Sequence, residues 1–391
     1  MVSALIRDET AKPRERLLYI DNLRLLVIVL VLSIHLAVTV SGFGSWYYIY
    51  PTHLDTLSTI WFTFYQSFTQ GYFLGLLFLI SGYFVAGSYD RRGFSGFIGE
   101  RSRRLLIPTL IYMVAITPLI VFVELPKSGT GGAAVSFVGF LSGTGPMWFA
   151  AALFGFSLIY AFWRLSASRG ASGSEKETEK QAPSRKQLEP TFTLAVTLIL
   201  IIGFFAFLIR IVQPIGTSIL NFQICYFSSY IILFIVGILA YRSNLLAKIS
   251  YRTGKRWLIS AVVLGFLAWF LLVVVVTVTG TTNAILGWLT WQSAAYSVWE
   301  SFIAVAMTIG LIGVFREKFN HQSKLVKTLS DNSFAVYMFH PMIIIPVTIL
   351  LAPLALYPIA KWLLLCVICV PLCFAATHYV FRRIPLLKKV L

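Results

Sequence analysis

Arg24 and His35 are the first residues of the chain whose types and spacing could carry out chemistry. Both lie in the apolar run 17–40, which is long enough to cross a bilayer. Eleven positions separate them. This is about three turns of an α-helix, so they share one face and lie roughly 16 Å apart along its axis. Because ionisable groups are costly inside a membrane, a permanent cation and a proton-exchanging group on one face indicate a functional path.

Each of these two residues also has a purely structural interpretation. An arginine near a helix end can extend its charged head to the membrane surface. A histidine within a span can act as a hydrogen-bond partner between helices. The first span alone leaves both interpretations open.

A second group of candidates falls near the predicted cytoplasmic surface. Arg101 and Arg104 are three positions apart, so they share one side of a helix. Clustered arginines at this surface bind lipid head groups, and their planar guanidinium groups also suit a nucleotide or pyrophosphate. Ser81, in the run LFLISGYF, is explained more simply by close helix packing.

A third group of polar residues gathers near the ends of apolar runs that the predicted topology places outside. Near a boundary such residues can simply be solvated. His340 lies about two turns into its run; Pro341, which frees backbone groups, offers a local explanation for its polarity. The candidates of this group are Trp148, Arg210 and Glu300, and His340 is a further candidate inside its span.

Aromatic residues also gather where the predicted spans meet the outside. Membrane-interface belts explain such residues, and a platform for stacking sugars is the alternative. They include Trp46, Tyr47, Tyr48, Tyr50, Trp288 and Trp291.

The composition is that of a membrane protein. Of 391 residues, 58% are hydrophobic and 12% are charged, whereas a soluble globular protein is about half apolar and a quarter charged. A net charge of +17 would suggest nucleic-acid binding in a soluble chain, but these basic residues lie between apolar runs and report topology. We therefore predict an all-α, polytopic integral membrane protein with no nucleic-acid partner.

Apolar runs of about twenty residues predict ten spans in a single membrane domain, residues 1–391. Basic residues are concentrated in alternate connections, which places both termini in the cytoplasm. The polar segment 165–190 is predicted to be a disordered cytoplasmic linker. The predicted spans are 18–40, 67–87, 104–123, 147–164, 191–211, 224–241, 257–278, 297–315, 333–352 and 358–380.

The four cysteines suggest neither a disulfide framework nor a zinc site, because all of them lie in apolar runs. We expect no metal and no tightly bound cofactor. The cysteines are Cys225, Cys366, Cys369 and Cys373.

The sequence resembles the membrane-bound acyltransferase 3 family. The arginine, ten intervening residues and histidine of the first span are similar to its signature, and further matching segments cover nearly the whole chain. VWESF and FRRIP are most similar to the glucan biosynthesis protein C branch, which is associated with succinyl transfer to periplasmic glucans. The matching segments are YIDNLR, LFLISGYF, ERSRRLLIP, GPMWFAAALFGFSLIYAFWR, FSSYIILFIVGILAYR, VWESF, SFAVYMFHP and FRRIPLLKKVL.

The resemblance implies that Arg24 and His35 form the central catalytic pair. It places Arg101 and Arg104 in the family's arginine-rich segment, where with Ser81 they are predicted to bind acyl-CoA. The residues predicted to bind the acceptor or the acyl group are Arg210, Trp148, Glu300 and His340.

The residues and the resemblance together predict an acyl-CoA-dependent O-acyltransferase. A succinyl or acetyl group would pass from cytoplasmic acyl-CoA, the co-substrate, to a hydroxyl of an extracytoplasmic glycan. His35 would be the general base, because histidine exchanges protons near neutral pH; an acyl-histidine intermediate stays open. Arg24 would hold the acyl-CoA or polarise its carbonyl, and Arg210 could pair with a succinyl carboxylate.

The predicted setting is the bacterial cytoplasmic (inner) membrane, crossed several times by the chain. Besides the lipid bilayer, acyl-CoA and the glycan, proteins of envelope glycan synthesis are expected partners. Two other classes stay open: a transporter or flippase of a glycan or lipid precursor, and a structural subunit of an envelope assembly. Stoichiometric release of free CoA would separate acyl transfer from transport.

Overall fold

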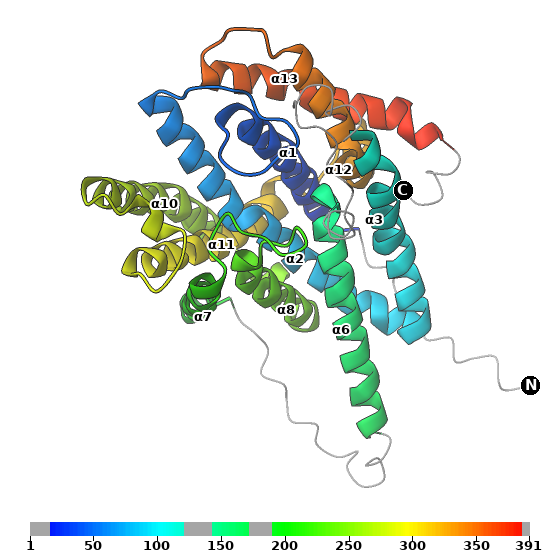
Figure 1. The fold of residues 1–391 in the computed structure, drawn as a ribbon. Helices are drawn as coiled ribbons and strands as arrows, with labels where there is room; N and C mark the ends of the chain where they lie inside the picture. Colours follow the sequence, from blue (N-terminus) through cyan, green and yellow to red (C-terminus); the bar gives the residue numbers. More distant parts are fainter. Residues whose placement is uncertain (1–15, 121–142, 172–189, 385–391) are drawn as a thin grey trace, which may run out of the picture.

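The computed structural model describes residues 16–120, 143–171 and 190–384, without the side chains of residues 168–171 (Figure 1). In these ranges the regular structure is helical, apart from an isolated bridge between Ile219 and Phe222. Two short helices are α3 (Ile107–Ile111) and α9 (Leu245–Lys248). The long helices are α1 (Leu18–Ser41), α2 (Thr56–Arg101), α6 (Trp148–Ala171), α7 (Phe192–Val212), α8 (Phe227–Ser243), α10 (Tyr251–Val278), α11 (Trp291–Lys318), α12 (Lys324–Leu350) and α13 (Pro358–Tyr379).

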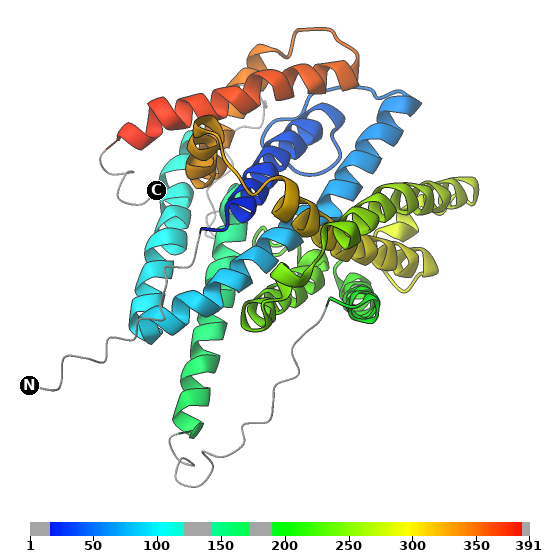
Figure 2. The same cartoon turned by 180° about the vertical axis from the view of Figure 1, so that it is seen from behind.

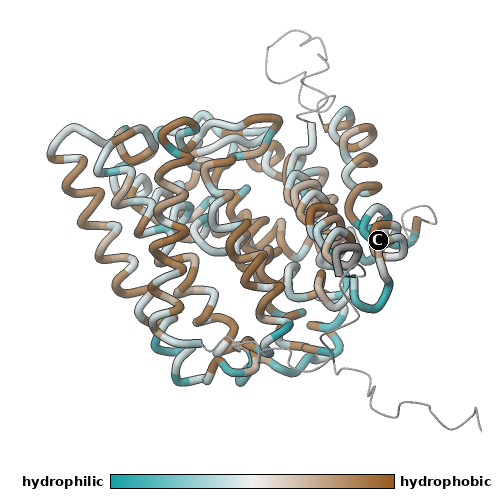
Figure 3. The backbone as a smooth tube through the Cα atoms, turned by 90° about the horizontal axis from the view of Figure 1, so that it is seen from below, coloured by the Kyte–Doolittle hydropathy of each residue, from teal (hydrophilic) through white to brown (hydrophobic). Residues whose placement is uncertain are grey.

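The described part of the chain contains nine helical stretches long and apolar enough to cross a membrane. The prediction of an all-α polytopic membrane protein is therefore confirmed. Apolar residues follow the middle of the helices, and hydrophilic residues gather mainly along one edge of the bundle (Figure 3). On α10, the side chains of Leu264, Leu267 and Leu271 are exposed, as expected of a lipid-facing surface.

One of the nine stretches, Thr56–Ile120, contains the second predicted span and most of the third. Gly93 interrupts its helical geometry with φ 65° and ψ −174°, a conformation that favours glycine. The chain reverses direction around this residue, in the cyan part of Figure 1. A reversal inside one stretch is compatible with two crossings, so the ten-span count and the cytoplasmic termini stay predictions.

The predicted linker lies mostly outside the described residues. Its first part, 165–171, continues α6 as helix. Residues 172–189 and the last part of the third predicted span, 121–123, fall outside the description.

α1 occupies the centre of the fold. It packs against α2, α11, α12 and α13, and the side chains of Leu23, Val27, Leu32 and Leu36 are fully buried (Figure 1, Figure 2). A helix surrounded in this way can hold a polar group away from lipid, because neighbouring helices supply its partners.

α2 and α8 approach each other at two glycines. A Cβ added to Gly82 would collide with the backbone carbonyl of Phe234, and one added to Gly237 would collide with that of Leu79. Only glycine allows backbones to lie this close. The packing role predicted for the LFLISGYF segment is thus seen at Gly82.

Candidate functional site

His35 and His340 form a hydrogen-bonded pair between α1 and α12. Nδ1 of His35 lies 3.0 Å from Nε2 of His340, and the two rings are nearly parallel, at 8°. His340 is fully buried, whereas His35 is only partly buried. His35 is therefore the more exposed member of the pair. Two candidates that the sequence placed in separate groups belong to one site.

Trp46 covers one face of His35. α1 ends at Ser41, and the next residue, Gly42, has a φ of 74° that turns the chain back, so the following loop reaches the histidine. The Trp46 and His35 rings are stacked, with centroids 3.8 Å apart and planes at 13°. The indole Nε1 is buried and has no hydrogen-bond partner among the described residues. A buried N–H of this kind is available to a ligand.

The other ring nitrogen of His340 is hydrogen-bonded to the backbone of its own helix. Nδ1 of His340 lies 2.8 Å from the carbonyl oxygen of Tyr337. The Tyr337 hydroxyl donates to the carbonyl of Pro146, in the turn Gly145–Met147 that precedes α6. The histidine pair is thus linked to the start of α6 as well as to α1.

Arg24 lies on the same face of α1 as His35, nearer the start of the helix. Its NH1 is 3.4 Å from Oδ1 of Asp21, and its guanidinium covers the Phe84 ring of α2 at 4.7 Å. Asp21 also pairs with Arg16, at 2.6 Å. One carboxylate therefore serves two arginines. With a side chain 39% exposed, Arg24 keeps charge available for another anion.

Arg101 and Arg104 lie close enough to Arg24 for like-charge repulsion, so we name these three residues the arginine cluster. Arg101 covers the Phe97 ring at 5.1 Å, and its Nε is buried without a partner among the described residues. Arg104 is mostly exposed and lies 3.4 Å from Glu100. Arginines gathered against their mutual repulsion suit an anionic ligand.

Ser81 lies on α2, near the contact that this helix makes with Arg24. It is partly buried on α2, three residues before Phe84, and therefore on the face that contacts Arg24. Its proposed contact with acyl-CoA stays a prediction.

Arg210 and Glu300 form a separate, buried ion pair between α7 and α11. NH2 of Arg210 lies 2.5 Å from Oε2 of Glu300, and NH1 donates to Ser297 at 3.1 Å. The rings of Tyr226 and Tyr296 flank the guanidinium at 5.5 and 5.4 Å. Arg210 is fully buried, so its charge is already matched within the protein.

Trp148 packs in an aromatic cluster with Phe222, Phe227 and Tyr230, at ring distances of 6.4, 6.3 and 5.9 Å. Its neighbour Phe149 contacts Tyr337 at 6.3 Å. Trp148 is therefore linked to the histidine pair only through Phe149 and Tyr337. Of the four predicted acceptor or acyl-group residues, only His340 contacts His35 in the described structure.

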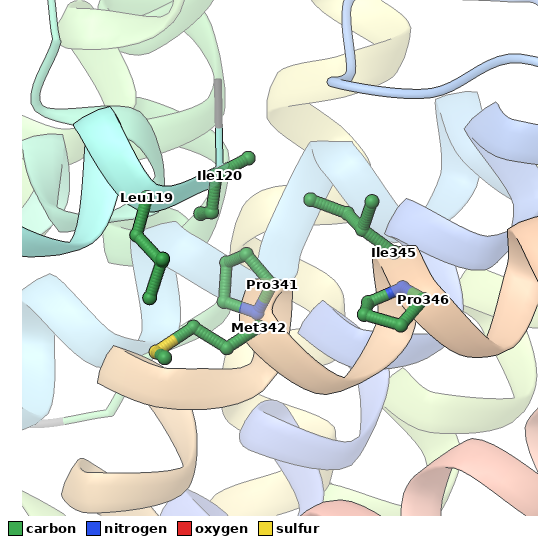
Figure 4. A pocket seen from close by; sticks show the side chains of 6 residues that line it. All are labelled: Leu119, Ile120, Pro341, Met342, Ile345 and Pro346. Atoms are coloured by element: carbon green, nitrogen blue, oxygen red, sulfur yellow. The ribbon is translucent and has the colours of Figure 1, made fainter. Parts of the chain in front are cut away.

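A small cavity of about 130 Å³ lies between Leu119 and Ile120 on one side and α12 on the other (Figure 4). Its α12 wall begins at Pro341, the residue after His340. All the side chains that line it are apolar, so it offers no reacting group. They are Leu119, Ile120, Pro341, Met342, Ile345 and Pro346.

The sequence predictions included His35 and His340 but missed Trp46 as part of the site. Trp46 was assigned to the interface aromatics. Its position four residues after Gly42, at the end of the span that carries His35, is the signal that could have revealed it. Among the described residues, no three potential metal ligands of the His, Cys, Asp or Glu type gather in one place.

The fold and the site define a polytopic membrane protein with a histidine pair inside its helical bundle. A family model described as an acyltransferase domain, that of the acyltransferase 3 family, matches residues 17–378. The chain therefore belongs to this family and is a membrane acyltransferase. Comparisons with curated proteins and with solved structures gave no match. The resemblance to the family is confirmed, and the glucan biosynthesis protein C branch stays a prediction.

Proposed function

We propose that this membrane acyltransferase moves a short acyl group from cytoplasmic acyl-CoA to a hydroxyl of an extracytoplasmic glycan, with His35 as the general base. The observation that carries the proposal is the position of His35. One ring nitrogen is bonded to the buried His340, while Nε2 has no hydrogen bond to a described residue. A partly exposed histidine with one free nitrogen is suited to accepting a proton.

The transfer needs two proton movements, one onto His35 and one away from it. Nε2 of His35 takes the proton of the acceptor hydroxyl while its oxygen attacks the thioester carbonyl carbon. The new carbon–oxygen bond forms, the carbon–sulfur bond breaks, and the proton passes from His35 to the sulfur of CoA. The buried N–H of Trp46, beside His35, is placed to donate to the carbonyl oxygen as negative charge develops.

The arginine cluster supports CoA as the donor. Guanidinium groups match the oxygens of phosphate and pyrophosphate, which CoA carries at one end. The reacting thioester lies at the other end of its pantetheine arm. Arg24 and His35 are roughly 16 Å apart along α1, a distance that an extended pantetheine arm would span.

Two observations bear on the identity of the acyl group, and they point to different groups. The resemblance to the glucan biosynthesis protein C branch supports succinyl transfer to a periplasmic glucan at the bacterial inner membrane. Against this, the cation predicted for a succinyl carboxylate, Arg210, is already paired with Glu300. We therefore favour acetyl, with succinyl as the alternative.

The experiment is reconstitution of the purified protein in liposomes with acetyl-CoA or succinyl-CoA on the donor side and a glucan acceptor on the other. A thiol reagent measures free CoA, and mass spectrometry measures acylated glucan. We expect both products in equal amounts, and no transfer by His35→Ala. Glucan or lipid movement without CoA release would instead identify a transporter or flippase.

Two routes are open for His35, direct base catalysis and an acyl-histidine intermediate. Omitting the acceptor separates them. Rapid quenching followed by peptide mass spectrometry would detect an acyl group on His35 only in the second route.

A further inference from the structure

We propose that Pro341 fixes the positions of the protons on the histidine pair, so that His35 always presents an unprotonated Nε2 to the substrate. Pro341 and His340 are then positioning residues. The catalytic consequence rests on the proposed function, but the proton positions themselves can be measured without substrate.

The argument begins with the backbone of α12. In an α-helix the carbonyl of Tyr337 accepts a hydrogen bond from the N–H of the residue four positions later. That residue is Pro341, which has no N–H. The Tyr337 carbonyl therefore needs another donor, since an unpaired buried backbone group is costly.

His340 supplies the donor that Pro341 lacks. A carbonyl oxygen only accepts, so Nδ1 of His340, 2.8 Å from the Tyr337 oxygen, must carry a proton. His340 is fully buried, and neither histidine interacts with a carboxylate of the described residues. A neutral imidazole avoids an uncompensated buried charge. The proton of His340 is then on Nδ1, and its Nε2 can only accept.

The second hydrogen bond passes this constraint to His35. Nε2 of His340 accepts, so Nδ1 of His35, 3.0 Å away, must donate. Neutral His35 then has a free lone pair on Nε2. Trp46, stacked on the ring, restricts its rotation. Both histidines therefore carry their proton on Nδ1, and His35 is ready to act as a base.

During transfer the same chain of hydrogen bonds supports the charged state. When Nε2 of His35 takes the acceptor proton, its Nδ1–H donates more strongly to His340, whose own Nδ1–H donates to the Tyr337 carbonyl. This arrangement orients the base and stabilises its cation, as a carboxylate does in other histidine-dependent enzymes.

α12 offers a matched control in a second proline. Pro346 also lacks an N–H, and it frees the carbonyl of Met342, but no histidine donates to that oxygen in the described structure. Pro341→Ala and Pro346→Ala therefore make the same chemical change in one helix. We expect only the first to affect the histidine pair.

The direct test is solid-state ¹⁵N NMR of the full-length protein in lipid nanodiscs, labelled only at histidine and kept at mildly alkaline pH. The chain has five histidines, so the signals can be assigned with single variants. We expect His35 and His340 to be protonated at Nδ1 in the native protein. In Pro341→Ala, which restores the backbone donor, we expect the His340 proton to move to Nε2, and Pro346→Ala should leave both signals unchanged.

Two NMR results would overturn the proposal. One is a resting His35 whose proton is on Nε2. The other is a pair of histidines whose proton positions are unchanged in Pro341→Ala.

The kinetic test compares two replacements of His340. The amide oxygen of His340→Gln can accept the proton of His35 Nδ1, whereas His340→Leu cannot. We expect the Leu variant and Pro341→Ala to lower kcat about 100-fold with little change in KM, the effect typical of impaired general base catalysis. His340→Gln should retain more activity than Leu. Equal losses in Gln and Leu at equal folded protein would contradict a positioning role.

These two tests keep the inference separate from the proposed function. If the NMR spectra show both protons on Nδ1 but the native protein releases no CoA, the acyl-CoA reaction is wrong and the proton arrangement stands. If CoA is released but the protons are not on Nδ1, the proposed reaction stands and the proton arrangement is wrong. Should Pro341→Ala fail to fold, the native spectrum still tests the proton positions. The Gln and Leu variants of His340 still test its positioning role.

Discussion

Arg210→Met tests whether the Arg210–Glu300 ion pair holds the fold together or binds substrate. The substitution replaces the guanidinium side chain with an unbranched apolar one. It leaves the Glu300 carboxylate buried without a cation. Oε1 of Glu300 already has no partner among the described residues, so both oxygens would then be unpaired. Removing one member of a buried pair costs about 3–5 kcal/mol of unfolding free energy. We expect Arg210→Met to fall in this range.

The opposite single variant should be milder. In Glu300→Gln the Arg210 cation keeps its bond to Ser297 and the faces of Tyr226 and Tyr296. The loss is then closer to that of one hydrogen bond to a charged group, about 1.5–3 kcal/mol. In the double variant Arg210→Met with Glu300→Leu, no charge stays buried. Its stability should return to within about 1 kcal/mol of the native protein, because such replacements are often neutral.

The assay is a double-mutant cycle on the unfolding free energy in micelles, measured by steric trapping or by denaturant titration. A loss below about 1 kcal/mol in Arg210→Met would refute the reasoning, since that is the size of a surface pair. So would a double variant as unstable as the sum of the singles. At equal folded protein, acetyl and succinyl transfer should fall together. A selective loss of succinyl transfer would show that Arg210 binds the donor carboxylate.

Three further predictions concern the site and the packing around it. Trp46→Phe keeps the stacked ring but loses the buried N–H. The kcat should therefore fall about 100-fold with little change in KM. An unchanged kcat would exclude a role for the indole N–H. Arg101→Gln should raise the KM for acyl-CoA several-fold and leave the acceptor KM unchanged in initial-rate measurements, and equal effects on both would contradict donor binding. Gly237→Val would force a side chain into the Leu79 carbonyl, so fluorescence-detected size-exclusion chromatography should show a large loss of folded protein, and a native profile would contradict the close helix packing.

The positions of the helices could be predicted from hydropathy, but not their full lengths. α1 was predicted at 18–40 and is observed at Leu18–Ser41. α10, α11 and α12 begin several residues earlier than their predicted spans, because helices continue in water beyond the apolar run. The reversal between the second and third predicted spans was expected, but the helical state of the residues around Gly93 was not. The polar residues near it are helical, although their composition indicated a connection.

The candidate residues could be selected from the sequence, but their partners could not. His35 and His340 were each recognised as unusual inside an apolar run, yet their pairing joins residues 305 positions apart. Arg210 and Glu300 were each interpreted as residues near a solvated boundary, and the structure places them together in the interior. Trp46 was missed because an aromatic residue at a membrane boundary has a common explanation. Contacts between helices depend on packing, which a single sequence does not reveal.

The most direct test of His35-dependent acyl transfer is mass spectrometry of surface and periplasmic glycans from a deletion strain. The strain would carry the native protein, His35→Ala, or His53→Ala, at matched membrane levels. His53 is exposed in the loop before α2 and serves as the histidine control. We predict an acetyl or succinyl mass increment with the native protein and His53→Ala, and none with His35→Ala. Equal restoration by all three proteins would contradict the proposed role of His35.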